Sequence, residues 1–217
     1  MNIVKIIKLD ILSVKPYLTI KNLVLLLFFS FFYAVLFKNP TMSIVMSSFF
    51  SILFAAYPFM VGEEAGIDPL FKIMGIKSDE VVKGRYLVSI FFVTIVVIIG
   101  TIFGIFVGIF YPMENGVVLL TGTALAVFLF TSVVIFMQYP LYFKLGYMKA
   151  KMVTGIPFFI IGILIFLSSK YSIKFRSLIQ FFIEHGYLML FGFFLIWCLI
   201  FFVSLTFSQK YYRKRDF

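Results

Sequence analysis

Six long stretches of this 217-residue chain contain no Asp, Glu, Lys or Arg, and nearly every charged residue lies in the short segments between them. The stretches run from 16 to 29 residues. A helix that crosses a lipid bilayer needs roughly 17 to 25 mostly apolar residues. The sequence therefore predicts an all-α membrane protein, a single domain over residues 1–217, with six transmembrane helices near 17–37, 41–61, 86–110, 117–143, 152–169 and 187–208.

Composition and charge placement support this class. The mean hydropathy of +1.11 and the 32 Phe residues give more apolar surface than a soluble domain of this size could bury. The net charge of +10 would suggest nucleic-acid binding in a soluble protein. Here, with the N-terminus inside, 15 of the 19 Lys and Arg residues fall in cytosolic segments. We therefore expect cytosolic N- and C-termini, contacts of the basic tail with membrane lipids, and no nucleic-acid partner.

Residues 1–16 are predicted to form an interfacial helix that lies along the membrane surface. Apolar residues at a spacing of three and four share one face, and lysines border that face where they can snorkel to the headgroups. Pro16 should end this helix before the first span. The residues of the apolar face are Val4, Ile7, Ile11 and Val14.

Residues 171–186 precede the last span and alternate apolar and polar faces at helical spacing. They predict an amphipathic extracellular helix that lies against the outer leaflet or dips into the bundle. Its apolar stripe consists of Phe175, Leu178, Ile179 and Phe182.

Gly100, Gly104 and Gly108 form a stripe of small residues on one face of the third span. Such a stripe lets two helices approach closely. The partner helix could belong to this chain or to a second copy.

The loop at residues 62–85 is the longest predicted cytosolic segment between spans. Asp68-Pro69 is a helix-start pattern, and Gly75 is placed to end the helix. Ser78 offers a second N-cap, for a helix that continues through Arg85 into the third span. The short helix should present apolar side chains to the cytosol, which need either the headgroup layer or a groove on a partner. These side chains are Leu70, Phe71, Ile73 and Met74.

The energy source for any transport must lie outside this polypeptide. None of the six stretches contains an ionisable Asp, Glu, Lys or Arg, which ion-coupled transporters place inside their spans. No phosphate-binding G-x-x-x-x-G-K segment occurs, and the 62–85 loop is too short for a nucleotide-binding domain. We expect no cofactor bound directly to this chain.

The sequence resembles a branch of the ABC type-2 exporter permeases. The resemblance rests on Tyr57-Pro58-Phe59, Glu63, Asp68, Leu70 and Gly84-Arg85-Tyr86-Leu87, and on a second cytosolic turn at residues 139–151. Within that branch, its size and low-charge spans resemble those of the permeases of the staphylococcal phenol-soluble-modulin exporter and of related antimicrobial-peptide resistance systems. One departure is Gly75-Ile76, where many relatives have Leu-Pro.

The resemblance implies a function and a set of site residues. The chain would be a multi-pass permease subunit in a bacterial cell membrane, exporting amphipathic peptides or hydrophobic antimicrobials. ATP and Mg would bind in a separate ABC ATPase subunit, and a second permease subunit would complete a homo- or heterodimer. The extracellular helix would form part of a gate. The ATPase-coupling residues would be Asp68, Pro69, Leu70, Phe71, Ile73 and Met74; the loop charges Glu63, Glu64 and Arg85, with Glu63 paired to Arg85; and the second cytosolic turn Lys144, Gly146, Tyr147 and Lys149.

Two other functions stay open at this stage. Glu63, Glu64 and Asp68 cluster at a membrane edge, where oxygen ligands could hold Mg²⁺ for a lipid or prenyl transferase. Alternatively, the chain could be an immunity or scaffold protein that binds a toxin without transporting it. Whether an ATPase accompanies the chain separates the last alternative from a permease.

Overall fold

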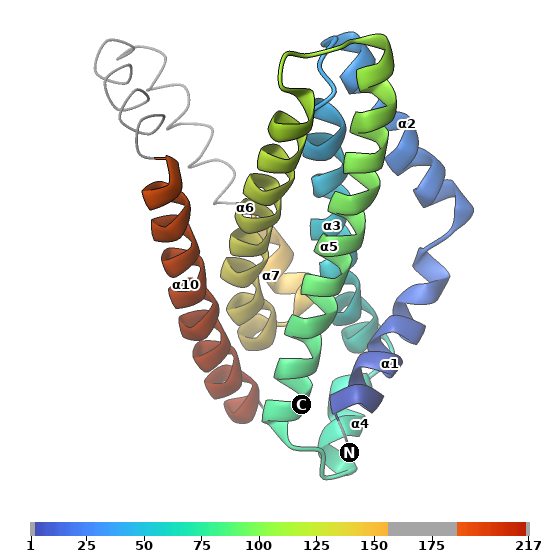
Figure 1. Cartoon of the computed structure of the whole chain (residues 1–217). Coiled ribbons are helices and arrows are strands. Elements are labelled where there is room, and N and C mark those ends of the chain that lie inside the picture. Colours follow the sequence, from blue (N-terminus) through green and yellow to red (C-terminus); the bar gives the residue numbers. More distant parts are fainter. Residues whose placement is uncertain (1–2, 156–185, 216–217) are drawn as a thin grey trace.

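The computed structural model describes residues 3–155 and 186–215, and within these ranges every regular element is a helix. The long helices run side by side in a bundle (Figure 1). The elements are α1 Ile3–Val14, η1 Lys15–Tyr17, α2 Ile20–Leu36, α3 Met42–Glu64, α4 Ile67–Ile73, α5 Ser78–Phe110, α6 Gly116–Leu145, α7 Tyr147–Val153 and α10 Gly186–Lys214.

Four of the described helices, α3, α5, α6 and α10, are long and apolar enough to cross a membrane. The 17-residue α2 passes the same test only together with α1 and η1, from which it is bent by 80°. These helices coincide with five of the predicted spans, which confirms a multi-pass membrane protein. The predicted fifth span, 152–169, starts within α7, and its residues 156–169 lie outside the described residues, as does the extracellular helix with Phe175, Leu178, Ile179 and Phe182. The count of six therefore stays a prediction.

Helix α5 is the centre of the bundle, because it packs against α1, α2, α3, α6 and α10. The glycine stripe explains its close approach to α3. A Cβ at Gly100 would lie 2.9 Å from the Cα of Ile44, and one at Gly104 would lie 3.0 Å from the carbonyl oxygen of Pro40. These two glycines therefore serve packing within this chain.

The N-terminal helix packs on the bundle through a face that the sequence pattern predicts only in part. The break at Pro16 is confirmed, since α1 ends at Val14 and η1 follows. However, the buried residues of α1 are Ile6, Asp10 and Val14, at a spacing of four, while Val4 is 69% exposed. The predicted apolar face is therefore corrected at Val4, while Ile7, Ile11 and Val14 do pack against a core cluster. The buried side of α1 extends further, to Ile6 and the charged Asp10, where the helix contacts α5.

Pro58 in α3 and Pro140 in α6 each leave a backbone carbonyl without its usual N–H donor. For Pro140, a neighbouring helix supplies a replacement donor. Pro140 removes the N–H that would bond the carbonyl of Phe136. The hydroxyl of Ser204 on α10 donates to that carbonyl instead. Since Ser204 has only one proton to donate, Tyr86 donates to Ser204 and accepts from Ser208, 2.8 Å away. This chain of hydroxyls joins α10 to α5 and α6.

Candidate functional site

The short helix α4 lies at the same end of the bundle as the first turn of α1 and the last turn of α10 (Figure 1). Its end is confirmed at Gly75, which has a φ of +67°. The N–H of Gly75 bonds the carbonyl of Lys72, and the N–H of Ile76 bonds that of Phe71. These two backbone hydrogen bonds form a Schellman motif. The hydrophobic contact that commonly accompanies this motif is present, because Ile76 and Phe71 pack in the same core cluster.

The start of α4 differs from the prediction. The N-cap is Gly66, with a φ of +63°, and not Asp68. The carboxylate of Asp68 makes an ion pair with Arg85, so it is not available to cap the helix. The next helix, α5, has Lys77 and not the predicted Ser78 at its N-cap, and Ser78 is its first residue. It runs through Arg85 without a break, as expected.

Helix α4 has one buried and one exposed face. Leu70, Ile73 and Met74 are 50%, 83% and 61% exposed. Phe71 is 3% exposed and belongs to the bundle core, so the expectation that it projects into the cytosol is wrong. In a helix, residues three apart share a face. Asp68 and Phe71 thus point inward together, and the apolar residues between and after them point outward.

Asp68 and Arg85 form a buried ion pair that fastens α4 to α5. Arg85 Nη2 lies 2.6 Å from Asp68 Oδ1, and Nη1 lies 3.4 Å from Oδ2. Arg85 is 1% exposed and Asp68 is 4% exposed. A guanidinium can bind both oxygens of a carboxylate at once, which fixes direction as well as distance. The pair therefore fixes the position of α4 relative to α5 in this structure.

Two aromatic rings, the glycine backbone at Gly62 and the hydroxyl of Tyr212 surround this pair. The guanidinium carbon of Arg85 lies 4.6 Å from the ring centre of Phe59 and 5.7 Å from that of Phe143, within cation–π range. A Cβ at Gly62 would come within 2.9 Å of Arg85 Nη2, so α3 can approach this close only without a side chain there. From α10, the hydroxyl of Tyr212 lies 3.4 Å from Asp68 Oδ1.

A second carboxylate reaches Arg85 from the N-terminal helix. Asp10 is 3% exposed, and its Oδ2 lies 3.9 Å from Arg85 Nε. Neither of these two atoms has a hydrogen-bond partner among the described residues. The sequence reasoning did not identify Asp10 as a site residue. The sequence signal that could have identified it is its position, since Asp10 lies four residues from both Ile6 and Val14 and so shares their helix face.

Glu63 has a different partner from the one expected. Its Oε2 accepts a hydrogen bond of 3.1 Å from the backbone N–H of Met148, in the first turn of α7. The predicted Glu63–Arg85 pair is therefore wrong, because Arg85 is already held by Asp68. Gly146 has a φ of +82°, and a Cβ there would lie 2.9 Å from Glu63 Oε2. Glu63 thus connects α3 to the turn between α6 and α7.

The remaining predicted site residues lie at the same end of the bundle. Glu64 accepts a 3.4 Å hydrogen bond from the hydroxyl of Tyr17. Lys144 lies over the ring of Tyr211, at 5.2 Å, and Lys149 is exposed. Tyr147 is partly buried, with its ring centre 5.7 Å from that of Tyr142. Pro69, next to Asp68, is also partly buried.

The predicted carboxylate cluster does not converge on a common point. Glu63 bonds Met148, Glu64 bonds Tyr17, and Asp68 pairs with Arg85. Among the residues that the structure describes, no group of three or more His, Cys, Asp and Glu side chains could hold a metal ion.

The last turn of α10 is attached to the loop that contains α4. Arg213 Nη2 lies 2.5 Å from Asp79 Oδ2, at the start of α5. The ammonium of Lys72 donates to the carbonyl of Arg215. Helix α1, through Asp10, and helix α10, through Tyr212, therefore both reach the Arg85–Asp68 pair.

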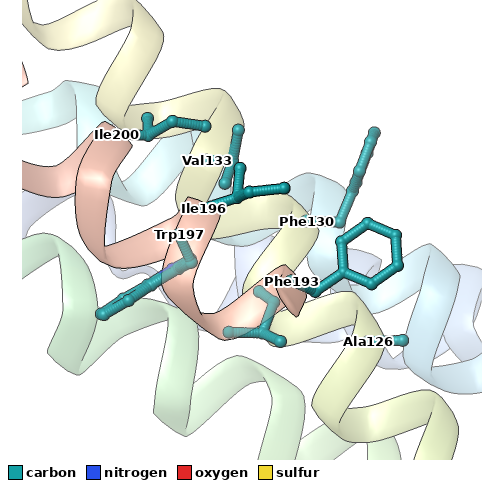
Figure 2. A pocket seen from close by; sticks show the side chains of 8 residues that line it. Ala126, Phe130, Val133, Phe193, Ile196, Trp197 and Ile200 are labelled. Atoms are coloured by element: carbon teal, nitrogen blue, oxygen red, sulfur yellow. The ribbon is translucent and has the colours of Figure 1, made fainter. Parts of the chain in front are cut away.

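An apolar groove of about 290 Å³ lies between α6 and α10. Figure 2 shows its side chains, which come from these two helices. No charged residue lines it. The lining residues are Ala126, Leu129, Phe130, Val133, Phe193, Ile196, Trp197 and Ile200.

Comparison with known proteins gives one match. The model of a family described as "ABC-2 family transporter protein" matches residues 5–213, nearly the whole chain. No curated protein and no solved structure gives a significant match. The matched range includes α4, the Arg85–Asp68 pair and Tyr212. The chain belongs to the ABC-2 family of transporter proteins and is a membrane-spanning permease component, a type of subunit that is not itself catalytic.

Proposed function

We propose that this chain is the permease subunit of an exporter that moves amphipathic peptides or hydrophobic antimicrobials out of a bacterial cell. ATP hydrolysis in a separate ABC ATPase subunit drives the movement, and a second permease subunit completes the transport path. Membership of the ABC-2 family supports an ATPase partner in general terms. The uncharged stretches of the sequence also support an external source of energy.

The observation that carries this proposal is the division of α4 into two faces. Its outer face exposes Leu70, Ile73 and Met74 at the end of the bundle where the loop charges gather. Exposed apolar residues in such a group need a partner surface. Its inner face is fastened to α5 by the Arg85–Asp68 pair. A partner that grips the outer face would therefore move α5, which contacts five other helices.

The groove between α6 and α10 supports an apolar cargo. Its lining offers only hydrocarbon and aromatic contacts. These suit the apolar face of an amphipathic helix and give no ligand for a free ion. The same surface would also accept lipid tails, so direct transport measurements must decide the cargo.

The experiment substitutes Ile73, the most exposed apolar residue of α4. The permease and its ATPase, identified by co-purification from native membranes, are reconstituted in inverted vesicles. ATP hydrolysis and uptake of a fluorescent amphipathic helical peptide are measured. Ile73→Asp should lower both by about tenfold, because it places a charge in an apolar contact, while the thermal midpoint of the permease stays unchanged.

Two variants serve as matched controls. Lys77→Gln changes the charge of the same loop by the same amount at an exposed position and should have little effect. Ile73→Leu keeps the apolar contact and should retain activity. Full coupling in Ile73→Asp would refute the assignment of α4. Failure of any ATPase to co-purify would instead favour a scaffold or immunity protein.

A further inference from the structure

Two carboxylates face a single guanidinium at the inner end of α4. Asp68 holds Arg85 with two contacts, the shorter of 2.6 Å, whereas Asp10 lies 3.9 Å from Nε. All three side chains are buried, and their formal charges sum to minus one. A buried charge needs a partner of opposite sign. Because only one cation is present in this group, the two carboxylates compete for it.

We propose that Asp10 is a positioning residue that competes with Asp68 for Arg85, so that the contact fastening α4 to α5 can be released and remade. In the structure described here Asp68 has the stronger contacts. In the alternative state Arg85 turns toward Asp10, and α4 is free to shift relative to α5. This inference rests on the proposed function, because a coupling helix must change its position during a transport cycle.

The packing of α1 places Asp10 within reach of that second state. A charge-assisted hydrogen bond from nitrogen to oxygen is about 2.7 to 2.9 Å long, so a shift of about 1 Å would bring Asp10 Oδ2 into a bond with Arg85 Nε. Ile6, one turn earlier on α1, packs directly on α5, where a Cβ at Gly84 would lie 2.9 Å from its Cγ2. Helix α1 is therefore held against α5 next to Arg85.

Stability does not account for a carboxylate at this position. Burial raises the pKa of Asp10 to about 6, an effect that Arg85 opposes and Asp68 reinforces. The ionised side chain therefore destabilises the fold at neutral pH. A buried charge that costs stability and lacks a hydrogen bond at Oδ2 is typical of a functional position.

Arg85 and Asp68 are the charged groups that shift the pKa of Asp10. The other acidic groups at this end of the bundle have partners elsewhere. On α3, Glu63 bonds Met148 and Glu64 bonds Tyr17. On α5, Asp79 pairs with Arg213. Glu80 of α5, Tyr139 of α6 and Tyr212 of α10 are further titratable groups at this end of the bundle, and Tyr212 contacts Asp68. A pH response of α4 between about pH 5 and pH 7.5 is therefore assigned to Asp10.

Hydrogen exchange of the α4 amides tests the competition in the full-length permease in lipid nanodiscs, without an ATPase. Asp10→Asn removes the competing charge, so Arg85 should stay with Asp68 and the α4 protection factors should rise by about fivefold. The thermal midpoint should stay the same or rise. Asp68→Asn should have the opposite effect on both. Glu114→Gln, the same carboxylate-to-amide change at an exposed turn at the other end of the bundle, should change neither.

The wild-type protein gives a second measurement that needs no substitution. Lowering the pH from about 7.5 to about 5 protonates Asp10 and should raise α4 protection as Asp10→Asn does. The Asp10→Asn variant itself should show no such change. Unchanged α4 protection in Asp10→Asn would overturn the proposal. Reduced protection with a lower thermal midpoint would also overturn it, since Asp10 would then be a plain structural support.

A third measurement separates this inference from the proposed function. In the reconstituted complex, Asp10→Asn should reduce ATP-driven transport at about pH 7.5, and its activity relative to wild type should approach one at about pH 5. If Ile73→Asp leaves coupling intact, the proposed function fails, whatever the exchange data show. If Ile73→Asp uncouples the complex but Asp10→Asn leaves α4 exchange unchanged, only the competition fails.

Discussion

Replacing Arg85 by Met removes the only cation from a buried group of three charges. The Met side chain keeps a long apolar stem against Phe59 and Phe143, so little packing volume is lost. Asp10 and Asp68, which are 3% and 4% exposed, would then face each other without a counter-charge. Each would have to be protonated, hydrated or moved to the surface before the native packing could form.

The cost follows from the burial of the pair. Removing one partner of a buried ion pair destabilises a protein by about 3 to 5 kcal/mol. For a chain of about this length, each kcal/mol lowers the thermal midpoint by roughly 2 to 4 °C. Arg85→Met should therefore lower the midpoint by on the order of 10 °C at neutral pH. The thermal midpoint of Arg85→Lys should fall between those of the wild type and Arg85→Met, since lysine keeps the positive charge but loses the two-point contact.

Intrinsic-fluorescence melting in a fixed detergent measures this effect. The control is Arg213→Met, which breaks the ion pair with Asp79. Those side chains are 61% and 37% exposed, so the expected loss is at most about 1 kcal/mol. Adding Asp68→Leu to Arg85→Met should recover part of the lost stability, because it removes one unpaired carboxylate. Equal midpoints for Arg85→Met and Arg213→Met would refute the argument that the buried pair fastens α4.

Three further predictions concern the contacts around this site. Gly84→Ala should cost about 1 kcal/mol through its clash with Ile6, and Ile6→Ala should relieve that cost in the double variant, as measured by additivity of melting shifts. Ser204→Ala should cost about 1 kcal/mol by leaving the carbonyl of Phe136 without a donor, and Pro140→Ala should rescue it by restoring a backbone N–H; a missing rescue would contradict the hydroxyl chain. Because the pKa of Asp10 is raised from 3.8 to about 6, its contribution to the free energy of unfolding is largest below the lower value and declines by about 3 kcal/mol as pH rises to the upper one. The difference between wild type and Asp10→Asn in melting scans across that window checks the sign.

The sequence predicted most boundaries of the described spans to within a few residues, and it also predicted the helix that begins near Ser78 and continues into the third span. Runs of uncharged apolar residues determine which segments can enter the membrane, and this property is local. The break at Pro16 and the end of α4 at Gly75 also followed from the conformational limits of single residues. The exposed face of α4 was predicted in part, since Leu70, Ile73 and Met74 are exposed.

Two of the predictions that failed depended on which distant segments meet. Phe71 was expected in the cytosol, and it lies in the core. Glu63 was expected beside Arg85, and it bonds Met148. The sequence lists several acidic and basic residues in the loop but does not show which of them form pairs. Coulomb attraction depends only on charge and distance, so any of these acids could pair with any of these bases until the fold sets the distances.

By itself, the sequence determined that this is a helical membrane protein with a short helix between its second and third predicted spans and with long stretches that carry no Asp, Glu, Lys or Arg. Only the tertiary structure decided that Asp10, Asp68, Arg85 and Tyr212 converge, from four helices separated by up to about 200 residues of chain. The physical reason is that hydropathy and helix-ending residues act over one or two turns. The partner of a buried charge depends on how whole helices pack, and in this bundle that packing is centred on α5.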